Sequence, residues 1–540
     1  MTNSILSNIK NNWKSGLTVA LISVPLSLSL AVASGASPET GLITAVWAGL
    51  LAGIFASSSY NIIGPAGALT GVLALFAFEN GPELLPTLAI VSGVFILIAY
   101  FIKLHRYMVL IPRSVMVGFS TGVAILIAIS QLRSVFGLHS LPSVAEPVEN
   151  LKLIGEHIGQ TEFTTFAIFA LGILLLWVFS KIIKKIPPAI FLAPIGIFVG
   201  YLISNGSLPF ETLLLNQKYI NLNLGLFSAL DNFKINQAVL VTGASVAFIA
   251  ILETLISAKI AGNMTKSRFD SRKELLGLSL ANIGSGFFGG LPATGVFVRT
   301  GLNVKSGATH KTSQIIQSVF VGLISVLLFQ TFTYMPLAII ASILIFSSVK
   351  MLEIKDLKKY WKYSKKDFIV AILVVVLMVG IDSVVGLLAG TVLALLYFVE
   401  NFSKGHFDIT RNRDNKFIDR LYEGDFEKFD EPMDVVVYSF KGSLTYVNGE
   451  THKDRLHEKM SLFNTVILRM RELGHIDHDG LEILYEIIEE LKHNKKDVYI
   501  TGMSEEVKDT MLKNDKANLI TKKMVLGNTT SALKELGFII

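Results

Sequence analysis

The sequence predicts an α-helical membrane protein with a small soluble α/β domain at its C-terminal end. Of the 540 residues, 51% are hydrophobic and only 17% are charged, whereas soluble domains carry about 25% charged residues. Apolar segments of about 20 residues, each long enough to cross roughly 30 Å of hydrocarbon, recur from Lys14 to Phe402. After Phe402 the composition becomes charged and polar. Residues 1–403 are therefore predicted to lie in a membrane.

Composition and motifs exclude several classes of protein. The chain has no cysteine, which rules out disulfides, zinc thiolate sites and cysteine nucleophiles. No Walker loop, dinucleotide fingerprint or nucleophile–base pair is present, so we predict neither an enzyme, nor an ATP-driven pump, nor a bound cofactor. The formal net charge is +6, but the basic residues fall mainly in short loops between apolar segments. This pattern indicates membrane orientation rather than nucleic-acid binding.

Fourteen membrane segments are predicted, seven in each of two halves, about 14–204 and 236–402. In the first half they are 14–33, 39–57, 62–78, 84–104, 112–132, 163–183 and 188–204. In the second half they are 236–260, 273–290, 293–304, 312–332, 335–350, 367–384 and 385–402.

The third segment of each half is interrupted by glycine and proline, which indicates two structural repeats. Because each repeat has an odd number of segments, the second must be inverted relative to the first. Lysine and arginine concentrate in the loops that face the cytoplasm if the N-terminus is inside, including Lys184, Lys185 and the lysine-rich stretch 350–366. Both termini are therefore predicted to be cytoplasmic.

The two interrupted segments predict an anion site near the middle of the membrane. A helix that begins inside the membrane leaves its first N–H groups unpaired and directs a positive dipole end at that point. Two such ends that face each other favour an anion. The residues predicted to surround it are Pro65, Ala66 and Gly67 in the first segment and Ala293, Thr294, Gly295 and Val296 in the second.

Three ionisable or polar side chains near this site suggest coupled transport. Arg299 would either add positive potential to the anion site or pair with Glu253, which lies in an otherwise apolar helix. Ser257, four residues after Glu253, shares its helix face. Glu253 and Ser257 could together bind Na⁺, or Glu253 could carry a proton, since burial favours a neutral carboxyl group. Glu253 could also serve only to neutralise Arg299.

Serines of the first segment are further candidates for the substrate cavity. Ser27 and Ser29 follow Pro25 and could line the cavity. Alternatively, their hydroxyls could hydrogen-bond to the carbonyl four residues earlier.

The C-terminal region is predicted to contain a linker, 404–431, and a cytoplasmic α/β domain, 432–540. Val435–Phe440, Thr465–Met470 and Asp497–Gly502 have the composition of strands, and Gly480–His493 has apolar residues at helical spacing. Alternation of strands and helices indicates a small sheet covered by helices.

Over nearly its full length the chain resembles the SulP anion transporters, called solute carrier family 26 in animals. The similar motifs in the membrane region are VPLSLSLAVASGASPETGL (24–42), IIGPAGALTG (62–71), ETLISAKIAGNMTKSRFDSRKELLG (253–277) and FFGGLPATGVFVRTGLNVKSGATHKTS (287–313). The segments YSFKGSLTYVNG (438–449) and VILRMRELGHIDHDGLEIL (466–484) are similar to a STAS domain.

The resemblance implies a seven-plus-seven inverted repeat divided into a core and a gate domain. It implies that anions bind between the half-helices that begin near Ala66-Gly67 and Thr294-Gly295, facing the first helix, with elevator-type alternating access in a homodimer. Sodium-dependent bicarbonate transporters of this family have an aspartate where this chain has Glu253, which leaves Na⁺ and H⁺ both open.

The sequence thus predicts a secondary active transporter of a small inorganic anion, of the sulfate or bicarbonate class, in the cytoplasmic membrane. It would be a symporter coupled to H⁺ or Na⁺. The alternatives are a transporter or exchanger of C4-dicarboxylates or chloride, and a channel-like membrane protein that senses anions.

Overall fold

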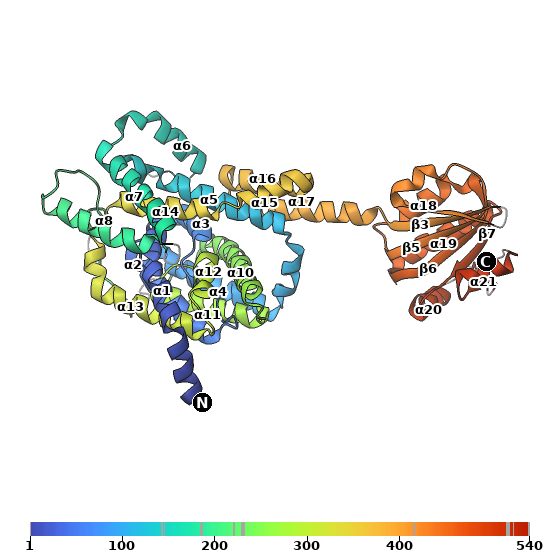
Figure 1. Ribbon diagram of the computed structural model, residues 1–540, viewed down its shortest axis with the longest axis horizontal. Coiled ribbons are helices and arrows are strands. Elements are labelled where there is room, and N and C mark those ends of the chain that lie inside the picture. Colours follow the sequence, from blue (N-terminus) through green and yellow to red (C-terminus); the bar gives the residue numbers. More distant parts are fainter. Residues whose placement is uncertain are drawn as a thin grey trace. The chain divides into compact units, whose positions relative to one another are not determined.

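The computed structural model describes residues 2–141, 144, 146–183, 187–219, 222–227, 233–413, 416–514, 519–521 and 523–537. Lys184 and Lys185, assigned above to a cytoplasmic loop, lie outside these ranges. The chain divides into two compact units, Met1–Ala394 and Leu395–Ile540, called here the membrane unit and the C-terminal unit (Figure 1).

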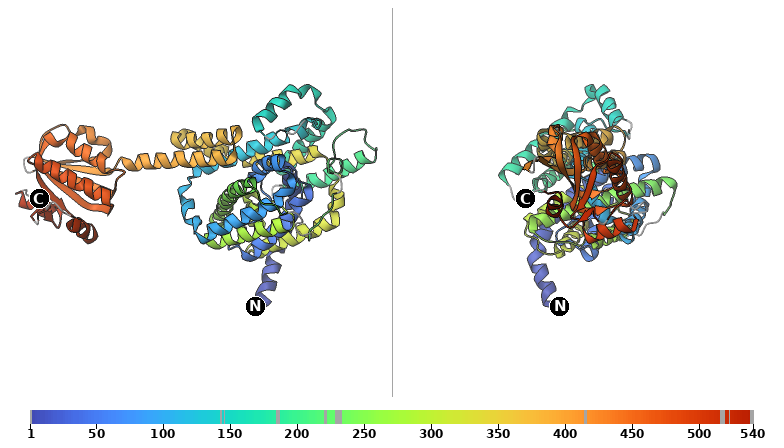
Figure 2. Two further views of the ribbon diagram at one scale, coloured as in Figure 1. Left: turned by 180° about the vertical axis from the view of Figure 1, so that it is seen from behind. Right: turned by 90° about the vertical axis from the view of Figure 1, so that its right-hand side faces the viewer.

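The membrane unit is built from helices (Figure 1, Figure 2). The first half contains α1 (Thr2–Ala33), α2 (Pro38–Phe55), α3 (Gly67–Asn80), α4 (Leu85–Phe101), α5 (Arg113–Phe136), α6 (Pro147–Glu156), α7 (Phe163–Ile182) and α8 (Ala189–Ser204). The second half contains α9 (Leu215–Lys218), α10 (Gln237–Thr265), α11 (Ser271–Phe287), α12 (Phe297–Lys305), α13 (Thr312–Phe332), α14 (Leu337–Met351), α15 (Ile354–Tyr363), α16 (Lys365–Gly380) and α17 (Ser383–Ser403).

Each of the fourteen predicted segments overlaps a helix, while α6, α9 and α15 lie between predicted segments. Among the described residues, nine helices are long and apolar enough to cross a membrane. The two interrupted segments differ from the other membrane segments, as their glycines and prolines predict. Each begins with a two-residue strand and continues as a short helix. These strands are β1 (Ile63–Gly64) and β2 (Thr294–Gly295).

The packing of the two halves follows the inverted repeat. Helix α4 of the first half packs against α10 and α11, and its counterpart α13 packs against α1 and α2. Likewise α5 packs against α16, and its counterpart α14 packs against α7. Replacing each helix by its counterpart in the other half therefore gives the same set of packed helix pairs.

These pairings define two helix groups. One group, the core domain, contains α1–α4 and α10–α13, and the other, the gate domain, contains α5, α7, α8, α14, α16 and α17. Both short helices that follow β1 and β2 belong to the core domain. The core and gate domains meet where α1 contacts α14 and α8, and where α3 contacts α5.

The C-terminal unit contains a six-stranded sheet in the order β4-β3-β5-β6-β7-β8. Its elements are β3 (His406–Arg413), β4 (Lys416–Tyr422), β5 (Met433–Leu444), α18 (Gly449–Glu458), β6 (Phe463–Ile476), α19 (His478–His493), β7 (Asp497–Thr501), α20 (Glu505–Asn514), β8 (Val525–Leu526) and α21 (Thr529–Glu535). The strands β5 to β8 pair in parallel, as expected for strands joined by helices.

The structure corrects the linker predicted at 404–431. Strands β3 and β4 occupy 406–413 and 416–422 and form an antiparallel pair at the edge of the sheet, where β3 also pairs with β5. The segment is polar because charged side chains are satisfied there: Asp408 is buried and forms ion pairs with Arg420 and Lys441, each at 2.6 Å. Counting charges could not distinguish such a strand from a linker.

A neutral histidine is built into the core of the C-terminal unit. His452 of α18 is 1% exposed, and its Nδ1 lies 2.7 Å from the Tyr438 hydroxyl of β5. Phe407 and Phe440 pack edge-on against its ring. Burial, together with the nearby charge of Arg455, lowers the pKa of His452 to about 3.

This pKa predicts that the C-terminal unit loses stability in mild acid. The unfolded chain binds a proton at His452 with a pKa near 6.5 and the native unit does not, so stability falls as pH drops below that value. Between pH 7 and pH 5 we expect a loss of about 2 kcal/mol, measured by urea unfolding of the C-terminal unit in the purified protein. The His452→Gln variant, which can still bond to Tyr438, should lack this loss. The same pH dependence in both proteins would contradict the assignment.

Candidate functional site

The site forms where the two interrupted segments cross. Strands β1 and β2 pair antiparallel, with Ile63 opposite Gly295 and Gly64 opposite Thr294, and Val296 N–H donates to the Ile62 carbonyl at 2.8 Å. Because the strands are antiparallel, the helices that follow them, α3 and α12, run in opposite directions from the crossing. Two helix N-termini thus lie at one place, as the sequence predicts.

The caps of these helices are the predicted residues. Ala66 is the N-cap of α3 and Val296 is the N-cap of α12, and neither has a side-chain cap. Pro65 precedes the first cap and has no N–H to leave unpaired. A Cβ on Gly67 would lie 2.7 Å from Ile127 Cδ1 of α5, so glycine lets the start of α3 approach the gate domain.

A buried polar network holds the strand β1. The Asn61 amide donates to Glu274 Oε1 at 2.8 Å, and its carbonyl oxygen accepts from Ser257 at 2.7 Å and Thr300 at 3.0 Å. Thr300 Oγ1 also accepts the Ile62 N–H at 2.9 Å. Helices α10, α11 and α12 are therefore fixed to the residues that lead into β1.

Buried hydrogen bonds from neighbouring helices also fix the strand β2. Asn282 of α11 accepts the Ala293 N–H at 2.8 Å and donates to the Ala293 carbonyl at 3.0 Å. Thr254 of α10 accepts the Gly295 N–H at 2.8 Å. Satisfied networks of this kind hold an irregular backbone rigidly inside a membrane protein.

Arg299 is the buried cation at the crossing. It is 1% exposed, and its guanidinium donates to the Ser27 hydroxyl of α1 at 3.4 Å. A Cβ on Gly64 would lie 2.9 Å from Arg299 Nη1, so the guanidinium lies directly against β1. Its Nε has no hydrogen-bond partner among the described residues, although buried donors are normally paired.

Glu253 lies beside this cation on α10. Its carboxylate accepts a hydrogen bond from the Thr294 hydroxyl of β2, and its charge interacts with that of Arg299. The carboxylate is therefore attached to the same strand that leads into α12.

Two predicted site residues take other partners. The hydroxyl of Ser257 faces Asn61 and Thr300, at 2.7 and 3.0 Å. Ser29 donates to the Pro25 carbonyl at 2.7 Å, which is the alternative given above for this serine. Of the two predicted serines of α1, Ser27 is the one that bonds to Arg299.

Sequence reasoning missed most of the supporting residues. Asn61, Thr254, Glu274, Asn282 and Thr300 were not identified, although each is a polar residue next to or within an apolar segment. Glu274 is fully buried and also accepts the N–H groups of Ser57 and Ser58, at 3.0 and 2.8 Å. Its position in a predicted membrane helix was the available signal, because a buried carboxylate in a membrane is costly and needs partners.

Comparison with known proteins agrees with this architecture. The model of the sulfate permease family matches residues 9–374, and the STAS domain model matches residues 428–528. The putative sulfate transporter YvdB of Bacillus subtilis is 28% identical over 94% of both chains. The bicarbonate transporter BicA of a Picosynechococcus species is 27% identical, with 93% of this chain and 90% of that protein covered.

Solved structures show the same fold. A structure of SLC26A9 superposes with a TM-score of 0.84 at 14% identity, covering 99% of this chain and 91% of that one. The transmembrane domain of a cyanobacterial BicA superposes with a TM-score of 0.61 at 24% identity, covering 72% of this chain and 97% of that domain.

The family match spans most of the membrane unit and includes both half-helices, Glu253 and Arg299. The prediction of an integral membrane transporter, not an enzyme, with a cytoplasmic STAS domain is confirmed by this membership. The chain belongs to the sulfate permease family.

Proposed function

We propose that this protein is a secondary active symporter of a small inorganic anion, of the sulfate or bicarbonate class. The observation that carries the proposal is the buried Arg299, whose Nε lacks a partner among the described residues, at the meeting point of two helix N-termini. Relatives named as sulfate and bicarbonate transporters, 28% and 27% identical, support this class of substrate.

The anion would lie between the half-helices, where the N–H groups of α3 and α12 and the guanidinium of Arg299 can reach it. Helix N-termini and guanidinium groups both prefer oxyanions. The low-dielectric surroundings strengthen these interactions. Ser27 supplies a hydroxyl from α1 at 3.4 Å from the guanidinium, so the first helix would form the facing wall.

Glu253 would couple transport to a cation. While it is ionised it repels an incoming anion and attracts Arg299, and when a proton neutralises it Arg299 is released toward the substrate. The Ser257 hydroxyl already bonds within the Asn61 network, so a Na⁺ ion held by Glu253 and Ser257 would have to break these bonds. This favours H⁺ over Na⁺ as the coupling ion.

Alternating access would be of the elevator type. Both half-helices, Glu253 and Arg299 belong to the core domain and are joined to it by buried hydrogen bonds. The core domain can therefore carry the complete site past the gate domain without taking it apart. We further propose that the transporter is a homodimer in which the STAS domains take part.

Uptake into proteoliposomes tests the proposal. Sulfate, bicarbonate, chloride and a C4-dicarboxylate are offered separately, each under an inward H⁺ gradient, an inward Na⁺ gradient and no gradient. We expect saturable uptake of sulfate or bicarbonate that an H⁺ gradient accelerates. Acceleration by Na⁺ alone would contradict the proton assignment, and large unitary currents would indicate a channel. Preference for chloride or a dicarboxylate would contradict the substrate class.

A further inference from the structure

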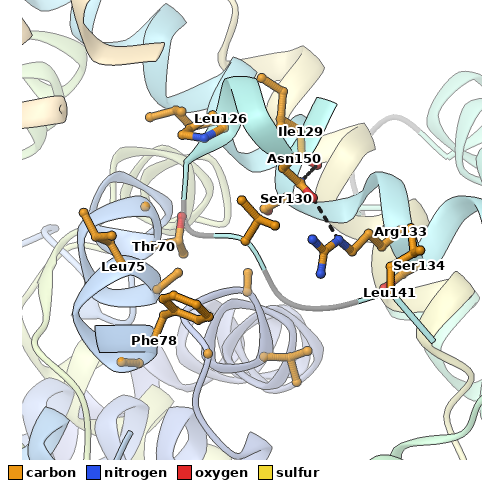
Figure 3. Close-up of a pocket in the computed structure, with 18 of the residues that line it drawn as sticks. Thr70, Leu75, Phe78, Leu126, Ile129, Ser130, Arg133, Ser134, Leu141 and Asn150 are labelled. Atoms are coloured by element: carbon orange, nitrogen blue, oxygen red, sulfur yellow. Dashed lines mark hydrogen bonds between the residues drawn. The ribbon is translucent and has the colours of Figure 1, made fainter. Parts of the chain in front are cut away.

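A cavity lies between the core and gate domains, apart from the residues of the central site. Its volume is about 480 Å³. It is lined by the C-terminal ends of α1 and α5, by α3, and by the turn between α16 and α17. Figure 3 labels lining residues of α3 and α5. These ends face the outer side in the topology derived from loop charges. The cavity reaches Thr70 and Gly71, within one turn of the N-terminus of α3.

Arg133 is built into the wall of this cavity. Figure 3 shows its guanidinium pointing into the cavity, with a hydrogen bond from Nε to Asn150 Oδ1 at 2.8 Å. Asn150 is itself buried and donates to the Ile129 carbonyl at 3.4 Å. One Nη of Arg133 is buried and has no hydrogen-bond partner among the described residues. The hydrogen bond to Asn150 thus orients the Arg133 guanidinium, which still has donors without a partner.

Lys218 supplies a second positive charge to the same cavity. Its side chain lines the cavity, and the surrounding protein together with the positive charge of Arg133 lowers the pKa of Lys218. The segment before it is anchored, because Leu215 N–H and Asn216 N–H donate to the carbonyls of Met335 and Thr333 at 3.1 and 2.9 Å. Two cations are therefore held near each other on fixed backbone.

No carboxylate among the described residues forms an ion pair with either cation. Asp382 also lines the cavity, but its Oδ1 accepts the N–H groups of Val384 and Val385 at 2.7 and 3.3 Å, which cap α17. Glu162 is not among the residues that line the cavity, and it accepts the Thr165 hydroxyl at 2.9 Å. The imidazole of His139 adds an Nε2 that has no partner in the described chain.

We propose that this cavity is an outer anion-binding station, in which Arg133 and Lys218 hold a small inorganic anion before it reaches the N-terminus of α3. The inference rests on the proposed transport of such anions and adds a second site for them. Two cations with unused donors in a recessed cavity raise the local anion concentration and favour its entry. The station determines apparent affinity for the external anion, whereas the central site determines transport itself.

Uptake of external sulfate by whole cells tests the station, with bicarbonate used if sulfate is not transported. For Arg133→Gln and for Lys218→Gln we expect KM to rise about tenfold with little change in the maximum rate, because each variant loses one hydrogen bond to a charged group. Higher ionic strength should raise KM in the wild type and hardly affect the double variant. The matched control is Lys152→Gln, which removes an exposed lysine of α6 on the same side.

A binding measurement separates this inference from the transport proposal. In the Arg299→Gln protein, which lacks the central cation, sulfate should still raise the melting temperature, and adding Arg133→Gln and Lys218→Gln should remove that shift. This result would support the station even if the wild type transports nothing. A KM unchanged in both single variants, or a sulfate shift unaffected by the added substitutions, would overturn the inference. If the Arg133→Gln protein fails to fold, the KM and the sulfate-induced shift in melting temperature of the Lys218→Gln variants decide between these outcomes.

Discussion

Replacing Arg299 with glutamine should nearly abolish anion uptake. The guanidinium is buried against β1, and its Nε has no hydrogen-bond partner among the described residues. Glutamine supplies neither the positive charge nor the forked donors of arginine. A charge-assisted hydrogen bond contributes up to about 3 kcal/mol, and this loss corresponds to a fall in affinity of about 100-fold. Titration with sulfate and with bicarbonate measures the affinity of the central site when Arg133→Gln and Lys218→Gln are present in both proteins, and initial rates in proteoliposomes measure the effect on uptake.

The same helix offers a matched control for this variant. Lys305→Gln removes an exposed positive charge from the last turn of α12, so it changes net charge equally and should leave affinity within about twofold, because exposed charges are screened. The Glu253→Gln, Arg299→Gln double variant separates two roles for Arg299. If Arg299 only neutralises Glu253, the double variant regains anion binding, and this recovery would contradict a direct contact with substrate.

The crossing of the half-helices could be predicted because its signals are local. Proline and glycine at 65–67 and 292–295 interrupt apolar segments that would otherwise continue, and few explanations other than a broken helix exist for such a break in a membrane. Arg299 and Glu253 stood out for a related reason, since a charge in hydrocarbon is expensive. The structure brings these four features to one place.

The residues that support the site could not be predicted with the same ease. Asn61, Thr254 and Thr300 are neutral, and a neutral polar residue in a membrane helix can satisfy itself on its own backbone, as Ser29 does. Which of them reach across to another helix depends on packing between segments about 200 residues apart, as for Asn61 and Thr254. Ser257 illustrates the difficulty, because it shares a helix face with Glu253 but bonds to Asn61.

Strands β3 and β4 lie in a segment predicted to be a linker, for a similar reason. Strand β3 (HFDITRNR) has only two apolar residues, Phe407 and Ile409, among eight positions, and its Asp408 would be excluded from a sheet interior by composition alone. Its ion pairs with Arg420 and Lys441 involve residues of two neighbouring strands. The pairing that makes the charge tolerable is visible only after the strands are placed side by side.

Replacing Glu253 with glutamine should uncouple transport from its driving ion. Glutamine is nearly isosteric and can still accept the hydrogen bond that the Thr294 hydroxyl gives to Glu253, so the half-helix α12 keeps its position. It can bind neither H⁺ nor Na⁺ by charge. We expect acceleration by an H⁺ gradient to disappear, a loss of up to about tenfold in concentrative uptake for each pH unit of gradient in a one-proton symport. Exchange of labelled for unlabelled anion across the membrane should continue.

This split between lost coupling and retained exchange distinguishes a coupling group from a structural one. A carboxylate needed only to hold Arg299 or Thr294 would, once removed, impair exchange and coupled uptake together. Glu79→Gln serves as the control, because it removes an exposed carboxylate from α3, the half-helix that faces α12, and should leave both rates unchanged. Proton-driven uptake that persists in Glu253→Gln would place the coupling group elsewhere. Loss of exchange would assign Glu253 to the architecture of the anion site, since the strand β2 would then depend on its charge.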